Sequence, residues 1–156
     1  MSTAAPEPTA VEAAPNTTWR LEVESETPGT YLAVAGLNSF SPTPAYTTAD
    51  NSDFNSGMWG SDLPTQMKMT IAATFIRRND GTAYDAGQEV LREAAYAADL
   101  VHVRYYDTAF DAAEAYEADA YVQWAPQGGG VTGIQTVNVT LNVQGAPETV
   151  TNPTAA

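Results

Sequence analysis

The sequence predicts a mainly β fold with one α-helix, arranged as an antiparallel β-sandwich or barrel with the helix packed against it. Residues 135–144 alternate apolar and polar side chains without a break, which is typical of a strand with one buried face. The eight tyrosines and three tryptophans of the 156 residues also favour β structure. Only residues 85–98 show the spacing of a helix with one apolar stripe.

The first two strands are predicted to form a hairpin. Residues 19–24 alternate Trp19, Leu21 and Val23 with charged side chains, and residues 31–35 return as the second strand. Between them, residues 27–30 place Pro28 and Gly29 at the two central positions of a type II turn.

A change of composition over residues 38–63 predicts a long loop. This segment is rich in Ser, Pro, Thr, Asp, Asn and Gly, yet it carries large apolar side chains: Phe40, Tyr46, Phe54, Met58 and Trp59. Loops of this length are uncommon in compact domains unless they are functional or disordered. Because a solvated linker needs no exposed aromatics, we expect a contact surface here.

The third strand and the helix follow. Pro64 introduces a strand with one apolar face, formed by Met67, Met69, Ile71, Ala73 and Phe75, and one more polar face, formed by Gln66, Lys68, Thr70, Ala72 and Thr74. Residues 79–81 make a turn. Asp85 and Gln88 resemble a capping box, and the helix has a single apolar stripe formed by Val90, Leu91, Ala94, Ala95 and Ala98.

The remaining elements complete one domain. Residues 100–106 are predicted as a strand, residues 110–116 fit either a helical turn or a strand, and residues 116–124 alternate like a strand. Three glycines at 128–130 lead to the final strand. We therefore expect a flexible arm over 1–17, a single β domain over 18–145 that contains the 38–63 loop, and a second arm over 146–156.

Charge and composition exclude several classes of protein. The net charge of −13 argues against a nucleic-acid-binding surface and against docking on anionic membranes. No apolar run approaches the ~20 residues that span a bilayer, and the first residues lack the pattern of a signal peptide. The absence of cysteine excludes disulfides, thiolate metal sites and a cysteine nucleophile.

Candidate catalytic residues are few. His102 is the single histidine and is interpreted as a structural residue, because one imidazole cannot build a histidine-rich metal site. Glu117 and Asp119 project from one strand face roughly 7 Å apart, a separation compatible with a glycosidase pair but also with a solvated face. Neither residues 50–53 nor the glycines at 128–130 complete a calcium or phosphate motif. We expect no enzymatic activity, metal or cofactor.

The chain resembles the tail tube protein (major tail protein) of long, non-contractile, siphovirus-type phage tails over residues 18–153. The resemblance lies in the order of several segments: Trp19-Arg20-Leu21-Glu22-Val23, Tyr31-Leu32-Ala33-Val34-Ala35-Gly36-Leu37, Trp59-Gly60-Ser61-Asp62-Leu63-Pro64-Thr65-Gln66, Arg77-Arg78, Tyr84-Asp85-Ala86-Gly87-Gln88-Glu89, Tyr121-Val122-Gln123-Trp124 and Gln144-Gly145-Ala146-Pro147.

This resemblance implies hexameric rings of β-sandwich subunits whose inner sheets join into a ring-wide barrel. The rings stack into a hollow tube around a tape-measure protein, with tail terminator and distal tail proteins at its ends, and DNA is ejected through it without specific binding. It implies a virion protein that assembles in the host cytoplasm.

Two surfaces acquire expected roles from this resemblance. The candidate residues lining the lumen are Gln66, Thr70, Thr74, Thr136, Asn138, Thr140 and Asn142, and the candidate inter-ring loop carries Phe40, Tyr46, Phe54, Met58 and Trp59. Lys68 falls on the lumen face, where a cation suits DNA passage least. The alternatives are a free-standing β-sandwich binding or decoration module and a glycosidase acting through Glu117 and Asp119.

Overall fold

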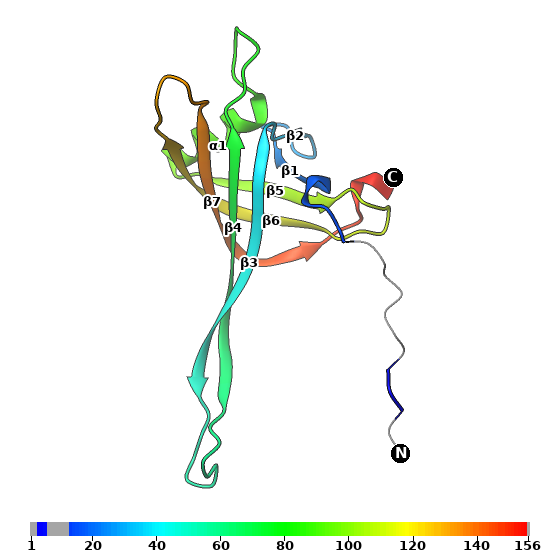
Figure 1. Cartoon of the computed structure of the whole chain (residues 1–156), viewed down its shortest axis with the longest axis vertical. Coiled ribbons are helices and arrows are strands. Elements are labelled where there is room, and N and C mark those ends of the chain that lie inside the picture. Colours follow the sequence, from blue (N-terminus) through cyan, green and yellow to red (C-terminus); the bar gives the residue numbers. More distant parts are fainter. Residues whose placement is uncertain (1–2, 6–12, 156) are drawn as a thin grey trace.

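The structure is a computed structural model that describes residues 3–5 and 13–155, in which seven strands form one antiparallel sheet with the order β2-β1-β5-β6-β7-β4-β3 (Figure 1). The elements are β1 (Trp19–Glu24), β2 (Tyr31–Ala33), β3 (Leu37–Asp50), β4 (Asp62–Ile76), α1 (Ala86–Ala97), β5 (Leu100–Asp107), β6 (Ala115–Gln127) and β7 (Thr136–Thr149), with short 3-10 turns η1 (Asn16–Thr18) and η2 (Pro153–Ala155). The predicted mainly β fold with one helix is confirmed.

The sheet curves so that its two ends approach each other and enclose the core. Trp19 of β1 and Phe40 of β3 come from opposite ends of the strand order, yet their ring centroids are 5.6 Å apart. Tyr105 packs against Phe40 and against Tyr116 at similar distances, 5.6 and 5.4 Å. The aromatic cluster therefore joins the two halves of the sandwich at one side.

The alternating patterns of β4 and β7 produce one buried and one open face. In the antiparallel register Ile71 lies opposite Leu141, Ala73 opposite Val139 and Phe75 opposite Val137. All six of these side chains are buried. Because neighbouring residues of a strand point to opposite faces, the Thr and Asn residues between them lie on the other side of the sheet, as the sequence predicts.

The first hairpin has the predicted turn. The Thr30 N–H donates to the Thr27 carbonyl oxygen at 3.2 Å, and Gly29 has a φ of +84°. A positive φ at this position of a type II turn is readily adopted only by residues such as glycine. The returning strand β2 ends at Ala33, two residues earlier than expected.

The helix α1 begins at the predicted cap but only half of the capping box forms. The Asp85 carboxylate accepts a hydrogen bond from the Gln88 N–H at 3.2 Å. The Gln88 side chain, however, is fully buried and donates to the carbonyl oxygens of Ala35 and Ile76 at 2.8 and 2.9 Å. Its amide thus ties α1 to the β2–β3 connection and to the end of β4.

The predicted loop over 38–63 is wrong, because most of this segment belongs to a long hairpin. Strand β3 extends to Asp50 and pairs along its length with β4, which already begins at Asp62, so that only residues 51–61 connect them. The sequence predicts a loop here because Pro42 and Pro44 are more typical of loops than of strands. Proline is tolerated at a sheet edge when its missing N–H would face away from the partner strand, and β3 is an edge strand.

The predicted C-terminal arm over 146–156 is also wrong for its described part. Strand β7 continues to Thr149, and the nearly buried Asn152 donates from Nδ2 to the carbonyl oxygens of Asp107 and Ala113 at 2.7 and 3.0 Å. Most of the predicted N-terminal arm, residues 1–2 and 6–12, lies outside the described residues. The ambiguous segment 110–116 is a turn that enters β6 at Ala115.

Candidate functional site

A continuous polar surface covers the open face of β4 and β7. Thr70 lies opposite Asn142, and Thr74 lies opposite Asn138, to which its hydroxyl donates at 2.9 Å. The structure thus brings together most of the predicted lumen residues on one exposed or half-exposed face: Thr70, Thr74, Thr136, Asn138, Thr140 and Asn142. Gln66 lies further along β4, beyond the end of the β7 pairing, opposite Thr47 of β3.

The same surface extends over two strands that the sequence interpretation did not include. Direct cross-strand partners add Tyr121, Gln123, Ala125 and Gln127 from β6, and Ser41, Thr43, Ala45 and Thr47 from β3. The alternation of residues 116–124 predicts the strand β6, whereas Pro42 and Pro44 make β3 unlike a strand in sequence. Among the residues named for this surface, Lys68 is the only charged one, and alternation along β4 places it on this face opposite Ala45. We call this surface the polar face.

The hairpin formed by β3 and β4 projects beyond the rest of the sheet (Figure 1). Strand β4 pairs with β7 only from Thr70 onward, so within the described residues the part of the hairpin nearer its tip has no third strand. Phe54, Met58 and Trp59 in the tip are at least 87% exposed, and Tyr46 on β3 is 62% exposed. Exposed aromatic and Met side chains are typical of protein–protein contacts.

Phe40 differs from the other residues of the predicted contact loop. Its ring packs between Trp19 and Tyr105 at the edge of the core, so it contributes to the sandwich and not to the projecting hairpin. The tip itself is held by local hydrogen bonds: the Asp53 carboxylate accepts from the Asn55 N–H at 2.9 Å, and the Asn51 N–H donates to the Ser61 carbonyl at 2.8 Å.

His102 belongs to a charged network on β5 and β6 that borders the polar face, because Asp119 lies two residues before Tyr121 on the same side of β6. Its Nδ1 lies 2.8 Å from an Asp119 carboxylate oxygen, and its Nε2 lies 3.3 Å from a Glu117 oxygen. Partial burial opposes the shift, but the hydrogen bonds to Asp119 and Glu117 prevail and raise the pKa of His102. The imidazole therefore occupies the space between the two carboxylates proposed as a glycosidase pair.

The same network continues onto β1 and β2. Burial, followed by the charge of Glu117, raises the pKa of Tyr31 to about 12, and the Tyr31 hydroxyl donates to Glu117 at 3.2 Å. Arg104 stacks on the Tyr31 ring at 3.9 Å and donates from Nε to Glu22 at 2.8 Å. Each charge already has an intramolecular partner, which is the arrangement expected of a structural ion-pair network.

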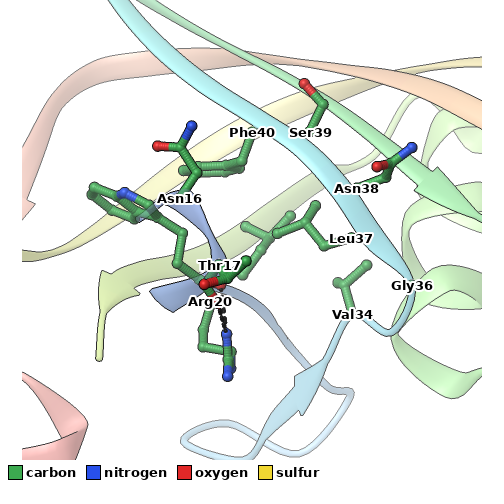
Figure 2. Close-up of a pocket in the computed structure, with 11 residues that line it drawn as sticks. Asn16, Thr17, Arg20, Val34, Gly36, Leu37, Asn38, Ser39 and Phe40 are labelled. Carbon is green, nitrogen blue, oxygen red and sulfur yellow. Dashed lines mark hydrogen bonds between the residues drawn. The ribbon is translucent and has the colours of Figure 1, made fainter. Parts of the chain in front are cut away.

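A pocket of about 420 Å³ lies between η1, β1 and the start of β3 (Figure 2). Arg20 is the one ionisable residue in its lining, and its guanidinium donates to the Thr17 and Trp19 carbonyl oxygens at 2.9 and 3.0 Å. The lining contains no nucleophile–base pair. Within residues 3–5 and 13–155, no three His, Asp or Glu side chains gather where they could hold a metal ion, and no described helix is long and apolar enough to cross a membrane.

Comparisons with known proteins find similarity at the level of structure. No protein-family model and no curated protein sequence matches the chain. The SPP1 tail tube, determined by solid-state NMR and cryo-EM, matches with a TM-score of 0.69 at 15% identity, over 90% of this chain and 80% of that chain. The tail of an empty gene transfer agent particle, refined with C6 symmetry, matches with a TM-score of 0.68 at 15% identity, over 88% and 99%.

A third structure extends the comparison. The six-fold symmetrised baseplate of the anti-feeding prophage matches with a TM-score of 0.64 at 7% identity, over 91% of this chain and 98% of that chain. At these identities the similarity establishes the fold, which is the phage tail-tube fold that the sequence resemblance predicts.

Proposed function

We propose that this chain is a structural virion protein whose copies form hexameric rings that stack into the hollow tail tube of a siphovirus-type phage. The observation that carries the proposal is the polar face, which covers parts of β6, β7, β4 and β3 on a tail-tube fold and has Lys68 as the only charge among the residues named for it. Long strands with one buried face and one wettable face are suited to a channel wall. DNA then leaves the capsid through this channel.

The edges of the sheet support ring formation. Strand β3 is an edge strand of 14 residues, so one side of its backbone has no partner strand in the described chain. An uncovered edge of this length can pair with another strand along the part that has no proline. In a ring it would be covered by the neighbouring subunit, and the inner sheets would join into one barrel. Sixfold closure is suggested by the C6 symmetry of the similar gene transfer agent tail.

The charge distribution supports passage of DNA without retention. The net charge of −13 repels phosphate, and the polar face carries only Lys68 as a cation. Each cation that engaged phosphate would add affinity through counterion release and slow the passage of DNA.

Further partners follow from the same proposal. A tape-measure protein fills the lumen before ejection, tail terminator and distal tail proteins close the two ends, and assembly takes place in the host cytoplasm. The contact between rings is assigned to the projecting hairpin with Tyr46, Phe54, Met58 and Trp59, which are exposed in the single chain.

A free-standing binding or decoration module is the second candidate. The observation favouring it is that the hairpin tip is already held by hydrogen bonds within the chain, such as Asn51 to Ser61. Such a module would present the tip to a ligand without assembling. The proposals differ in the oligomeric state that they require.

Negative-stain electron microscopy of the purified chain, with its mass in solution at low and high concentration, tests the proposal. Rings or hollow tubes are the expected result. A monomer at every concentration, still monomeric after seeding with preformed phage tail tips, would contradict the tube and favour the module.

A further inference from the structure

A cleft lies at the end of the molecule opposite the hairpin tip. It has a volume of about 1040 Å³ and is lined by residues of α1, of the segment after β4 and of the connection between β6 and β7. Figure 1 shows these elements at the end of the molecule opposite the tip of the β3–β4 hairpin. Arg77, Tyr84, Arg92, Tyr96 and Trp124 line it together with parts of residues 126–137. We call it the α1 cleft. Its size is that of cavities that enclose several side chains or a small ligand.

One wall of the α1 cleft is a fixed stack of a cation and aromatic rings. The guanidinium carbon of Arg77 lies 3.8 Å from the centre of the Tyr84 ring and 5.2 Å from that of Trp124. Arg77 also donates to Gln88 Oε1 at 3.1 Å and pairs with Glu89. Because Arg77 is held from several sides, this wall is rigid before any partner arrives.

The second cation of the cleft is less enclosed. Arg92 pairs with Glu89 at 2.7 Å, and its side chain remains 38% exposed. Hydrogen bonds from Arg92 and then Arg77 lower the pKa of Glu89 to about 2, so this single carboxylate is ionised and shared by two guanidinium groups. The cluster therefore carries a net positive charge, in a chain with only six basic residues.

The hairpin tip, residues 50–63, has the opposite character. Asp50 and Asp62 lie directly opposite each other in the last pair of the hairpin. Two like charges in this position destabilise a sheet. No Lys, Arg or His occurs between residues 21 and 67 to offset them. The same tip exposes Phe54, Met58 and Trp59. An acidic tip with exposed aromatics complements a cleft lined by arginines and aromatic rings.

The two surfaces lie at opposite ends of one strand. Strand β4 starts at Asp62 in the tip and ends at Ile76, directly before Arg77 in the cleft. At about 3.3 Å per residue its 15 residues span roughly 50 Å. Complementary surfaces at opposite ends of a molecule give a head-to-tail contact that repeats without closing, and such a contact builds a stack.

We propose that the hairpin tip of one copy inserts into the α1 cleft of a second copy, with its aromatic side chains against the Arg77–Tyr84–Trp124 wall and its Asp50–Asp62 pair toward Arg92. This inference rests on the proposed tube function and specifies which surface receives the hairpin. The glycines at 128–130 have no atoms near the position of a Cβ, so the β6–β7 connection has room to adjust to the inserted tip.

A charge exchange tests the contact. Arg92→Glu and Asp62→Lys are each expected to raise the protein concentration needed for tube formation by about tenfold, because like charges then meet in the cleft. Asp62→Lys combined with Arg92→Glu is expected to restore assembly. Glu93→Lys, an exposed substitution on the same helix, serves as the control, and thermal unfolding of each variant verifies that it folds.

Cross-linking provides a second test, because the chain has no cysteine of its own. Met58 and Val131 are almost fully exposed. Mixing the Met58→Cys and Val131→Cys variants under mild oxidation is expected to give a disulfide-linked pair of copies. Met58→Cys mixed with Phe110→Cys is expected to give about fivefold less of that product, because Phe110 is exposed in the connection between β5 and β6 and does not line the cleft.

The outcomes separate the two proposals. One outcome would overturn the docking inference and leave the tube function standing: the unmodified chain forms tubes, the Arg92 and Asp62 variants form them at the same protein concentration, and Met58→Cys and Val131→Cys give no selective cross-link. A chain that forms no rings or tubes under any condition, and no cross-link, would overturn both.

Discussion

Gly87 in the first turn of α1 lies against the backbone of Ala33 in β2 so closely that a Cβ at position 87 would overlap the Ala33 carbonyl oxygen. The position is buried and a glycine is required by space, since its φ is not positive. The contact sets the distance between the helix and the edge of the sheet.

Gly87→Ala is therefore expected to destabilise the fold by about 1–3 kcal/mol, the range for overpacking, although alanine favours helix more than glycine does. Chemical denaturation of the purified subunit measures this change. Gly128→Ala is the matched control, because a Cβ there meets nothing within 4 Å. Equal stability of the two variants would contradict the role assigned to this contact.

Gln88 is expected to be among the most sensitive polar residues. Its amide group donates to Ala35 and Ile76 and accepts from the Arg78 N–H at 3.1 Å, and the side chain is fully buried. Gln88→Met keeps most of the side-chain volume but leaves these backbone groups without partners. The free energy of unfolding is therefore expected to fall by about 1–3 kcal/mol. Gln123→Met, on the exposed face of β6, should unfold at nearly the wild-type denaturant concentration.

Positive charge on the polar face is expected to impair DNA delivery without preventing assembly. Thr70→Lys with Asn138→Lys adds two cations to this face, which raises its affinity for phosphate groups. Electron microscopy should show intact tubes, while infectivity or ejected DNA falls. Thr27→Lys with Ala109→Lys adds the same charge in exposed turns and should have little effect. Normal infectivity of the first pair would contradict the lumen assignment.

The His102 network is expected to make stability depend on pH. Because its pKa is raised in the folded chain, its contribution is fully present below the ordinary value of 6.5 and is lost as the pH rises through the folded pKa. The wild type should thus lose more stability than His102→Gln between pH 6 and pH 9. Parallel pH profiles of the two proteins would show that the Asp119 and Glu117 contacts do not favour the protonated imidazole.

Much of the sheet could be predicted from alternation alone, because the burial of one face imposes a period of two. The apolar residues of β7, from Val137 to Val143, are all buried as predicted. The type II turn at Gly29 and the cap at Asp85 also follow from local chemistry, since each depends on residues within four positions.

The features that could not be predicted depend on contacts between distant segments. Asn152 appears in a tail of polar and small residues, and its burial depends on carbonyl groups of Asp107 and Ala113 that only the folded chain supplies. Phe40 resembles its exposed neighbours in sequence but meets Trp19 across the sandwich. The α1 cleft likewise unites residues from three separate segments.

The two prolines of β3 have a consequence for the protein before assembly. Pro42 and Pro44 have no N–H. The outer side of this edge strand therefore lacks the backbone hydrogen-bond donors at these two positions. A ladder between two such edges would lack these hydrogen bonds, so random pairing of one β3 edge with another is disfavoured. The free edge of β3 therefore favours a partner strand that needs no donor at these two positions over random pairing with another copy of itself.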